Sequence, residues 1–242
     1  MVTSLTIIRY RRRYVPFALL AMAVFRLPLS FNKNISFFKL LGCGKNGSFD
    51  KTPDWQQWGL LTIHDLEPEG KKDLKPGWQI NHHGKFISKW LKFFGCEVWT
   101  VVLQPIEGHG TWDKKEVFGT LPKQTDYKGP IAVLTRATIR ITKLKAFWKH
   151  VNGVSSQMAG APGFVTSIGV GEVPWIKQAT FSVWQSKESM RQFAYSLPAH
   201  KEVIVKTHQE KWYSEDMFVR FRIISQQGTI KGKDPLVALT LV

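Results

Sequence analysis

The stretch IAVLTRATIRI, residues 131–141, indicates the fold, because it begins a second copy of an order of elements already present in the first half. Its run of β-branched and apolar residues predicts a strand. After it the sequence predicts a helix over 144–159, strands over 163–169 and 178–184, a helix over 186–212 interrupted near Pro198, and a strand over 217–224. The second half therefore has the order β-α-β-β-α-β, which is ferredoxin-like.

The first half repeats this order. It predicts a strand over 5–10, a helix over 14–27, strands over 35–41 and 58–64, a helix over 79–94 and a strand over 98–104. Weak residue echoes support a duplication: His83 and His200 occupy matching positions, and Gly110-Thr111 and Gly228-Thr229 follow the two last strands.

The predicted fold class is therefore α+β, with two tandem ferredoxin-like units packed face to face as a single-chain dimeric α/β barrel. The units are residues 1–106 and 129–230, with a polar connection over 107–128 and a tail over 231–242. Two unrelated α+β domains are the alternative.

The composition is basic but not that of a disordered tail. The chain has 242 residues, 34 Lys and Arg against 18 Asp and Glu, a formal net charge of +16 and 43% hydrophobic residues. That hydrophobic content can build a core. Two cysteines exclude a disulfide scaffold and a Cys-based zinc site, and a reducing compartment is expected. The charge calls for an anionic partner: nucleic acid, a membrane surface or an acidic protein.

The N-terminus has the basic and apolar parts of a signal peptide, but we interpret it differently. Arg9 and residues 11–13 are basic, and residues 15–25 are apolar. No small-x-small cleavage site follows, and Arg26 comes at once. We expect a buried amphipathic helix with Pro16 in its first turn, and no apolar run that reaches the roughly 18 residues of a membrane span. A shallow membrane contact stays open.

No metal or nucleotide motif stands out, so the histidines are judged singly. His200 follows Pro198 at a fresh helical turn, and His208 lies about 80° further round the helix. A neutral imidazole can bind iron, although an ordinary solvated histidine is the alternative. His82 and His83 are adjacent, so we expect them to point in different directions.

Arginines and tryptophans supply further candidates. Arg136 and Arg140 alternate along one strand, and an inward arginine needs a carboxylate or an anionic ligand. Trp175, Trp184 and Trp212 all fall in the second half of the sequence, and aromatic surfaces suit a flat cofactor or a polyene. Core packing is the alternative for them.

Four segments carry a resemblance to a known family. They are FFKLLGCGKNGSF (37–49), LTRATIR (134–140), GVGEVPWIKQATFSVW (169–184) and EDMFVRFRII (215–224). They resemble the spheroidene monooxygenases, the carotenoid-oxidising enzymes of purple bacteria. The likeness runs over about residues 19–229, and GEVPW followed by a strand is its most specific part.

The resemblance implies a carotenoid oxygenase that uses O₂, a haem cofactor and electrons from a small ferredoxin. The wider group of dimeric α/β-barrel haem proteins places an axial histidine on the second helix of a unit, and His200 matches that position. Arg136 is the candidate for a distal catalytic group or a haem-propionate contact, and Trp184 for a catalytic pocket wall. Cys43 and Cys96 are the rival iron ligands.

The resemblance also reinterprets the charge of +16. A basic surface would attract an acidic ferredoxin and an anionic bilayer, so we expect a cytoplasmic protein, peripheral at the inner face of the cytoplasmic membrane, without a nucleic-acid partner. Two other functions remain open. One is a haem-free barrel monooxygenase acting on a small polycyclic or quinone substrate, and the other is a basic RNA-binding module.

Overall fold

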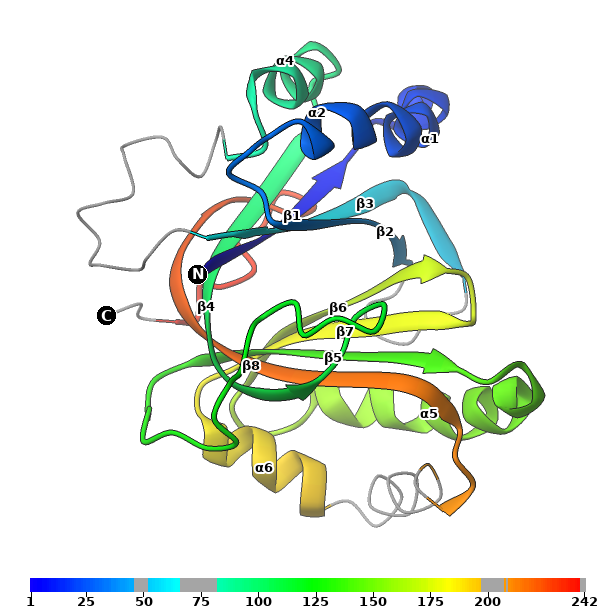
Figure 1. Ribbon diagram of the computed structural model, residues 1–242, viewed down its shortest axis with the longest axis vertical. Helices are drawn as coiled ribbons and strands as arrows, with labels where there is room; N and C mark the ends of the chain where they lie inside the picture. Colours follow the sequence, from blue (N-terminus) through cyan, green and yellow to red (C-terminus); the bar gives the residue numbers. More distant parts are fainter. Residues whose placement is uncertain (46–51, 66–81, 197–206, 208, 240–242) are drawn as a thin grey trace.

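The computed structural model describes residues 1–45, 52–65, 82–196, 207 and 209–239 (Figure 1). The first unit contains β1 (Val2–Arg9), η1 (Arg12–Tyr14), α1 (Val15–Val24), α2 (Arg26–Ser30), β2 (Phe37–Gly44), β3 (Pro53–His64), α4 (Lys85–Phe93) and β4 (Glu97–Gly110). The second contains β5 (Ile131–Ile139), η2 (Ile141–Lys143), α5 (Leu144–Ala159), β6 (Phe164–Val173), β7 (Lys177–Trp184), α6 (Lys187–Ser196) and β8 (Tyr213–Gly228).

The strands form a closed barrel in the order β1-β3-β2-β6-β7-β5-β8-β4. Each half contributes an antiparallel four-stranded sheet, β4-β1-β3-β2 and β8-β5-β7-β6, so the same order occurs twice. Figure 1 shows the two sheets facing each other, with α1, α2 and α4 outside the first and α5 and α6 outside the second. The predicted fold class, a single-chain dimeric α/β barrel, is confirmed.

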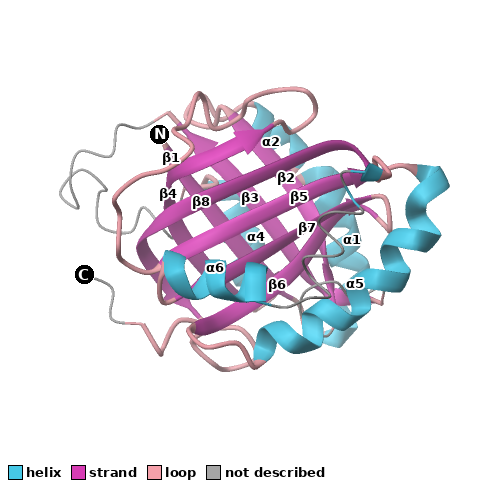
Figure 2. Cartoon of the chain, turned by 90° about the horizontal axis from the view of Figure 1, so that it is seen from below, coloured by secondary structure: helices cyan, strands magenta, loops and turns pink. Residues whose placement is uncertain are grey.

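Two unequal seams join the sheets. β4 pairs with β8 from Trp99↔Gly228 to Gly110↔Met217, almost the whole length of β4. β2 pairs with β6 only at Gly42↔Gly171 and Cys43↔Val170. Figure 2 shows the strands of both sheets lying side by side and forming the wall of the barrel. One side of the barrel is therefore fully hydrogen-bonded, and the other is held by a short contact.

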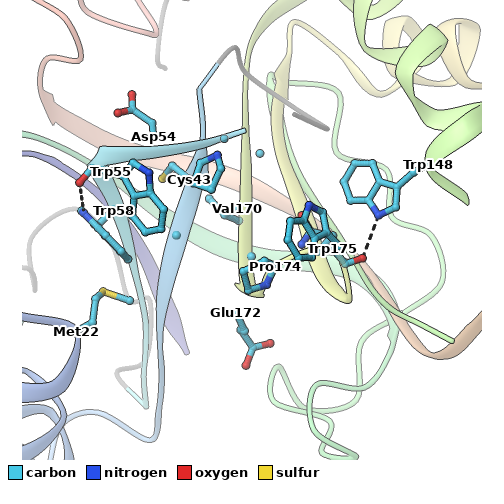
Figure 3. Close-up of a pocket in the computed structure, with 16 residues that line it drawn as sticks. Met22, Cys43, Asp54, Trp55, Trp58, Trp148, Val170, Glu172, Pro174 and Trp175 are labelled. Atoms are coloured by element: carbon cyan, nitrogen blue, oxygen red, sulfur yellow. Dashed lines mark hydrogen bonds between the residues drawn. The ribbon is translucent and has the colours of Figure 1, made fainter. Parts of the chain in front are cut away.

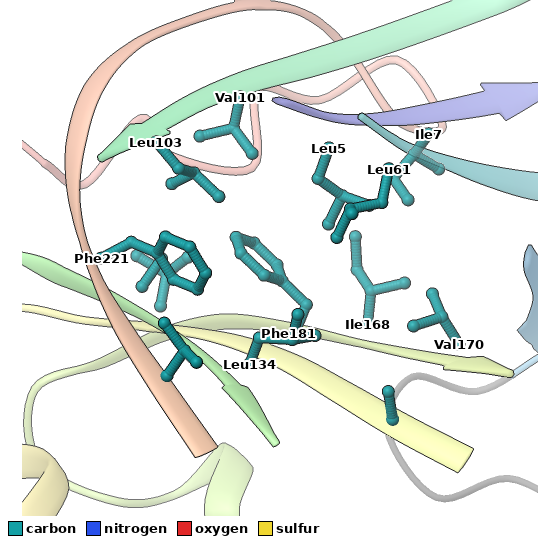
Figure 4. Close-up of a cluster of buried hydrophobic side chains, with 14 of the residues drawn as sticks. Leu5, Ile7, Leu61, Val101, Leu103, Leu134, Ile168, Val170, Phe181 and Phe221 are labelled. Carbon is teal, nitrogen blue, oxygen red and sulfur yellow. The ribbon is translucent and has the colours of Figure 1, made fainter. Parts of the chain in front are cut away.

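The interior of the barrel is an apolar core shared by both units (Figure 4). Alternate residues of each strand point inward, as the two-residue period of a strand requires. Leu5, Leu61 and Val101 come from the first sheet, and Phe181 and Phe221 from the second, and each is at most 2% exposed. The halves therefore share one core, which favours duplication over two separate domains.

Glycines turn the chain at the ends of β4 and β8. Gly110 and Gly228 both have φ near +93°, and a Cβ on Gly228 would lie 1.9 Å from the carbonyl oxygen of Val98. Thr111 and Thr229 then donate to Glu215 and Glu97, respectively. The Gly-Thr echo in the sequence thus marks two equivalent corners of the barrel.

The segments predicted as a connection and a tail are partly structural. β4 runs to Gly110, into the predicted 107–128 connection, and Trp112 and Phe118 are buried in the barrel core. Leu236 of the predicted tail is buried there too. The polar composition of these segments concealed single apolar residues that close the ends of the barrel.

The helices differ from expectation in three places. The predicted helix over 14–27 ends at Val24, and α2 follows after Phe25. Because VPFALLAMAV has no polar residue, α1 is apolar on both faces rather than amphipathic. α4 begins at Lys85, with residues 79–81 outside the described part, and the predicted break near Pro198 also lies outside it.

One helical run, Arg12–Ser30, is long and apolar enough to cross a membrane by length and composition alone. It has 19 residues because RRY (12–14) and RLPLS (26–30) extend the apolar run of residues 15–25, and 22% of it is buried. Ala18, Ala21, Phe25 and Leu29 pack into a cluster with the sheet, as the residues of a core helix do. Its opposite face is exposed.

The corner glycines give a test of barrel closure. Gly228→Ala should lower the free energy of unfolding by clearly more than the roughly 1–2 kcal/mol cost of a left-handed alanine, because its methyl group meets the Val98 carbonyl. Gly232→Ala is the matched control, since Gly232 has φ +73° but nothing within 4 Å of its Cβ position. Urea unfolding measures both. If the two variants lose the same free energy of unfolding, the contact between residue 228 and β4 does not contribute to stability.

Candidate functional site

An open pocket lies over the short β2–β6 seam (Figure 3). It holds about 800 Å³, part of it open to solvent. Trp55 and Trp58 of β3 stand on one side, and Trp148 of α5 and Trp175 of the β6–β7 turn on the other. The pocket is therefore lined by both units and by aromatic side chains.

Hydrogen bonds fix these tryptophans. The Trp58 indole N–H donates to the Trp55 carbonyl at 2.9 Å, and that of Trp148 donates to the Trp175 carbonyl at 3.2 Å. Trp55 and Trp175 are each 54% exposed, so their ring faces remain available. An aromatic surface held in this way can bind a flat or extended apolar ligand.

Arg136 lies inside the barrel, at one end of the core. It is 1% exposed, its Nη1 donates to Glu215, and its Nη2 lies 3.5 Å from Oε1 of Glu172. Its guanidinium carbon is 5.4 Å from the centre of the Trp112 ring. The carboxylate that an inward arginine was expected to need is thus supplied by the protein.

The same cluster contains two lysines and a third carboxylate. Lys39 bonds Glu172 at 2.6 Å and also bonds Asp113, while Lys177 bonds Asp113 at 2.8 Å. Burial opposes ionisation of Asp113, but the hydrogen bonds from Lys177 and Lys39 lower its pKa to about 2. Three basic side chains therefore face three carboxylates, so the formal charges of the cluster cancel.

Trp184 lies on the other face of the sheet from Arg136. It is 1% exposed, its indole N–H donates to Ser182, and its ring packs against Phe164 and Phe193 beneath α6. Since Arg136 faces the barrel interior, the two predicted catalytic residues do not line one pocket. Trp175 and Trp212 also lie apart from Trp184: Trp175 lines the seam pocket, and Trp212 packs with Phe147 and Trp148 of α5.

One residue on the outer face of the second sheet, Thr135, is exposed between the clusters that pack under the helices. Val133 and Ile139 of β5 are buried under α5 and α6 in two separate clusters, yet Thr135 between them is exposed. Thr135 pairs with Thr180, which pairs with Gly169, so small residues cross the sheet here. The buried Thr180 hydroxyl has no hydrogen-bond partner among the described residues.

His200, the predicted iron ligand, and His208 lie outside the described residues. In the first unit, His64, His82 and His83 are at most 5% exposed, and Nε2 of His82 lies 3.4 Å from Nδ1 of His83. The expectation that this adjacent pair points apart was therefore wrong. Burial lowers the pKa of His83 to about 4. Over the described residues, no group of three or more His, Cys, Asp or Glu side chains could hold a metal ion.

The cysteines are poor thiolate ligands here. Burial raises the pKa of Cys43 to about 12, and it does the same for Cys96. A thiol with such a pKa stays protonated at neutral pH, whereas metal ligation needs the thiolate.

The fold and the pocket define a class: a duplicated ferredoxin-like α/β barrel with an aromatic pocket on its outer seam. A solved aldoxime dehydratase in complex with butyraldoxime has this fold, with a TM-score of 0.59 and 10% identity over 92% of this chain and 79% of that one. A second aldoxime dehydratase has a TM-score of 0.55 and 10% identity, over 92% and 80% of the two chains. At such low identity, these structures show the fold alone.

Sequence relatives identify the family. The chain is 30% identical to a spheroidene monooxygenase of Rhodobacter capsulatus over an alignment of 244 positions, which covers 99% of this chain and 97% of the relative. It is 32% identical over 216 residues to that of Cereibacter sphaeroides, covering 89% of this chain but only 64% of the relative. The chain belongs to the spheroidene monooxygenase family, a family of oxidoreductases. No protein-family model matches it.

Trp55, Trp58 and Trp148 were not identified as pocket residues from the sequence. Two of the segments that carried the resemblance, 37–49 and 169–184, do contain its glycines and Trp175. Nothing in the sequence indicated that these segments pair, because more than a hundred residues separate them. The one available signal for the pocket was that both glycine-rich segments resemble the same family.

The charge cluster around the buried Arg136 predicts a stability effect at that residue. Arg136→Met should lower the free energy of unfolding by about 1.5–3 kcal/mol, because the half-buried Glu215 loses the charged hydrogen bond from Arg136, while Lys39 and Lys177 still pair Glu172 and Asp113. Arg140→Met, at an exposed position just after β5, is the control. Chemical unfolding at pH 7 measures both, and equal stability of the two variants would contradict a structural role for the cluster.

The pH dependence of this effect has a definite sign. The folded pKa of Asp113 is about 2, and that of Glu215 is also lowered. Their stabilisation is therefore present above the unfolded carboxyl pKa near 4 and is lost as the pH falls toward 2. The wild type should lose stability over this range. Arg136→Met should lose less, because Arg136 is one of the groups that lower the pKa of Glu215, whereas Lys177 and Lys39 still lower that of Asp113.

Proposed function

We propose that this protein is an O₂-dependent monooxygenase that oxidises a carotenoid to a keto or hydroxy product. Its membership of the spheroidene monooxygenase family, with the match extending over nearly the whole chain, carries the proposal. The aromatic pocket supports it, because a carotenoid is a long, flat, uncharged polyene.

The proposed cofactor is haem, bound on the outer face of the second sheet. The described residues there are compatible with a flat group: Thr135 is exposed between two packed clusters, and the small residues Thr180 and Gly169, both buried, follow it across the same face. His200 is the proposed axial ligand, on the strength of the resemblance alone. When bound, haem supplies O₂ activation at iron.

The chain's own residues would position and shield this group. Trp184, Phe164 and Phe193 close one end of the face, and Phe147 and Trp148 of α5 close the other. These rings exclude water, which protects reactive oxygen chemistry from side reactions. Arg136 takes no part in this wall, since it lies inside the barrel, and its proposed role is to hold the sheet in place.

A ferredoxin-type protein is the proposed electron donor. The net charge of +16 would attract an acidic donor and increase its association rate at low salt. Only one layer of helices covers the proposed haem face, so this face lies near the surface of the protein.

The absorption spectrum of the purified protein tests the haem proposal. Protein expressed with a haem precursor should show a Soret band that shifts with dithionite and CO, and His200→Ala should lose it. His109→Ala is the control, since His109 is exposed on β4. A colourless, haem-free wild type would overturn the haem proposal, and full activity on a small polycyclic or quinone substrate without metal would select the haem-free alternative.

The proposed site of action is the inner face of the cytoplasmic membrane, where the outer face of α1 and α2 would lie. Apolar side chains are exposed along this face, namely Phe17 (41%), Leu19 (46%), Leu20 (49%), Leu27 (65%) and Phe31 (80%). Arg11, Arg12 and Arg13 are exposed beside them. A bilayer with anionic lipids complements both features, at about 1 kcal/mol per basic residue near its surface.

Vesicle flotation tests this contact. The wild type should float with phosphatidylglycerol-containing vesicles, and less so with phosphatidylcholine alone or at high salt. Leu20→Asp should abolish flotation, because it places a charge on the apolar face. Val237→Asp, at a position 80% exposed in the C-terminal segment, should float like the wild type. Equal flotation of the two variants would refute this face as the contact.

A further inference from the structure

The pocket over the β2–β6 seam has a floor without side chains. Leu41 and Cys43 of β2 and Ile168 and Val170 of β6 face the barrel core. Since strand residues alternate, Gly42, Gly169 and Gly171 present the outer face between them. The two strands of the seam therefore leave a trough where other strands carry side chains.

The registers give the width of this trough. Across the sheet, Trp58 pairs with Gly42, Gly42 with Gly171, and Gly171 with Gln178. Two glycine strands thus separate Trp58 from Gln178, and at a strand spacing of about 4.8 Å the gap between their backbones is about 14 Å. The side chain of Gln178 lies over Gly171, with its Nε2 3.1 Å from the position of a Cβ there. The open part of the floor for a flat chain is therefore over Gly42, on the Trp58 side of the gap.

Aromatic walls enclose the glycine floor. Figure 3 shows Trp55 and Trp58 facing Trp148 and Trp175 across β2 and β6, with Met22 of α1 near one end. The first pair belongs to the first unit and the second pair to the second unit. The trough occupies the place where the helical layers of the two units part, between α1 and α5.

The trough carries no unpaired charge among the residues that line it. Asp54 bonds Arg9 at 2.7 Å, and Glu172 accepts from Lys39 at 2.6 Å and from the Trp112 indole at 2.7 Å. Cys43 is held as a neutral thiol, as its burial dictates. Charge complementarity therefore favours an uncharged ligand over an anion or a charged peptide.

Strand pairing links the floor of the trough to the proposed haem face. Gly169 pairs with Thr180, and Thr180 pairs with the exposed Thr135 on the same outer face. Two strand spacings, about 10 Å, separate Gly169 from Thr135. At its other end the trough meets Met22 of α1, the helix whose opposite face is apolar and exposed.

We propose that the trough is the binding site for the conjugated chain of the carotenoid, which enters beside α1 and lies on the glycine floor between the four tryptophans. The choice of a polyene rests on the carotenoid substrate proposed above. The geometry gives the chain a direction, with the membrane face of α1 at one end and Thr135 at the other.

Gly42→Leu tests the trough, because it adds a side chain to the floor without disturbing the strand. A Cβ at Gly42 would have Gly171 O as its nearest neighbour, at an ordinary 3.8 Å. The purified protein, with its cofactor, is titrated with spheroidene in detergent micelles under anaerobic conditions, without an electron donor. Quenching of tryptophan fluorescence and induced circular dichroism of the polyene bands report binding.

Gly42→Leu should weaken binding at least tenfold, and Trp55→Ala should weaken it measurably. Gly160→Leu is the matched control, since it adds the same side chain where nothing lies within 4 Å, at the C-terminal end of α5. A Gly42→Leu protein that keeps the wild-type thermal midpoint and binds spheroidene as tightly as Gly160→Leu overturns the proposal. If Gly42→Leu fails to fold, Trp55→Ala decides, because Trp55 is 54% exposed and its change leaves the floor intact.

Turnover separates this proposal from the proposed function. A wild type that binds spheroidene in the trough but never oxidises it refutes the proposed function and leaves the binding site standing. A Gly42→Leu protein that binds and oxidises spheroidene like the wild type refutes the trough and leaves the function standing. Displacement of spheroidene by equimolar oleate would show a general acyl site and would also overturn the commitment to a polyene.

Discussion

The pairing of β4 with β8 is the interaction on which the rest of the structure depends. Two separate ferredoxin-like sheets would each expose an edge and an apolar inner face, whereas this seam hydrogen-bonds the edges and lets the faces share one core. Its length requires the chain to turn sharply at Gly110 and Gly228, where a side chain would collide with the neighbouring strand. Trp112 and Leu236 then fill the ends of the barrel just after these turns.

The second seam has a different role because it is short. With only two paired positions, β2 and β6 close the barrel without bringing helices together above them. Glycines on their outer face turn this gap into a trough, and tryptophans from both units border it. The asymmetry between the seams thus separates a structural side of the barrel from a side that can bind a ligand, although both arise from the same duplicated unit.

Charge is divided between the interior and the surface. Inside, Arg136 and its lysine neighbours are matched by three carboxylates, so they add little to the external field. The excess of Lys and Arg is therefore carried mainly by the surface, where Arg11, Arg12 and Arg13 border the exposed apolar residues of α1. An apolar helix beside a basic cluster, next to a trough for an uncharged chain, is a coherent arrangement for a protein whose proposed substrate is dissolved in a bilayer.

The sequence by itself determined the two ferredoxin-like units, the barrel class and the family, because strand alternation, helix periodicity and the GEVPW segment are local patterns. It also identified Arg136 as an inward arginine in need of a carboxylate. It could not place Arg136 and Trp184 on opposite faces of the sheet, since one residue of register decides the face. The tertiary structure alone decided the site at the seam, because the glycines and tryptophans that form it come from strands of different units, and only closure of the barrel brings them together.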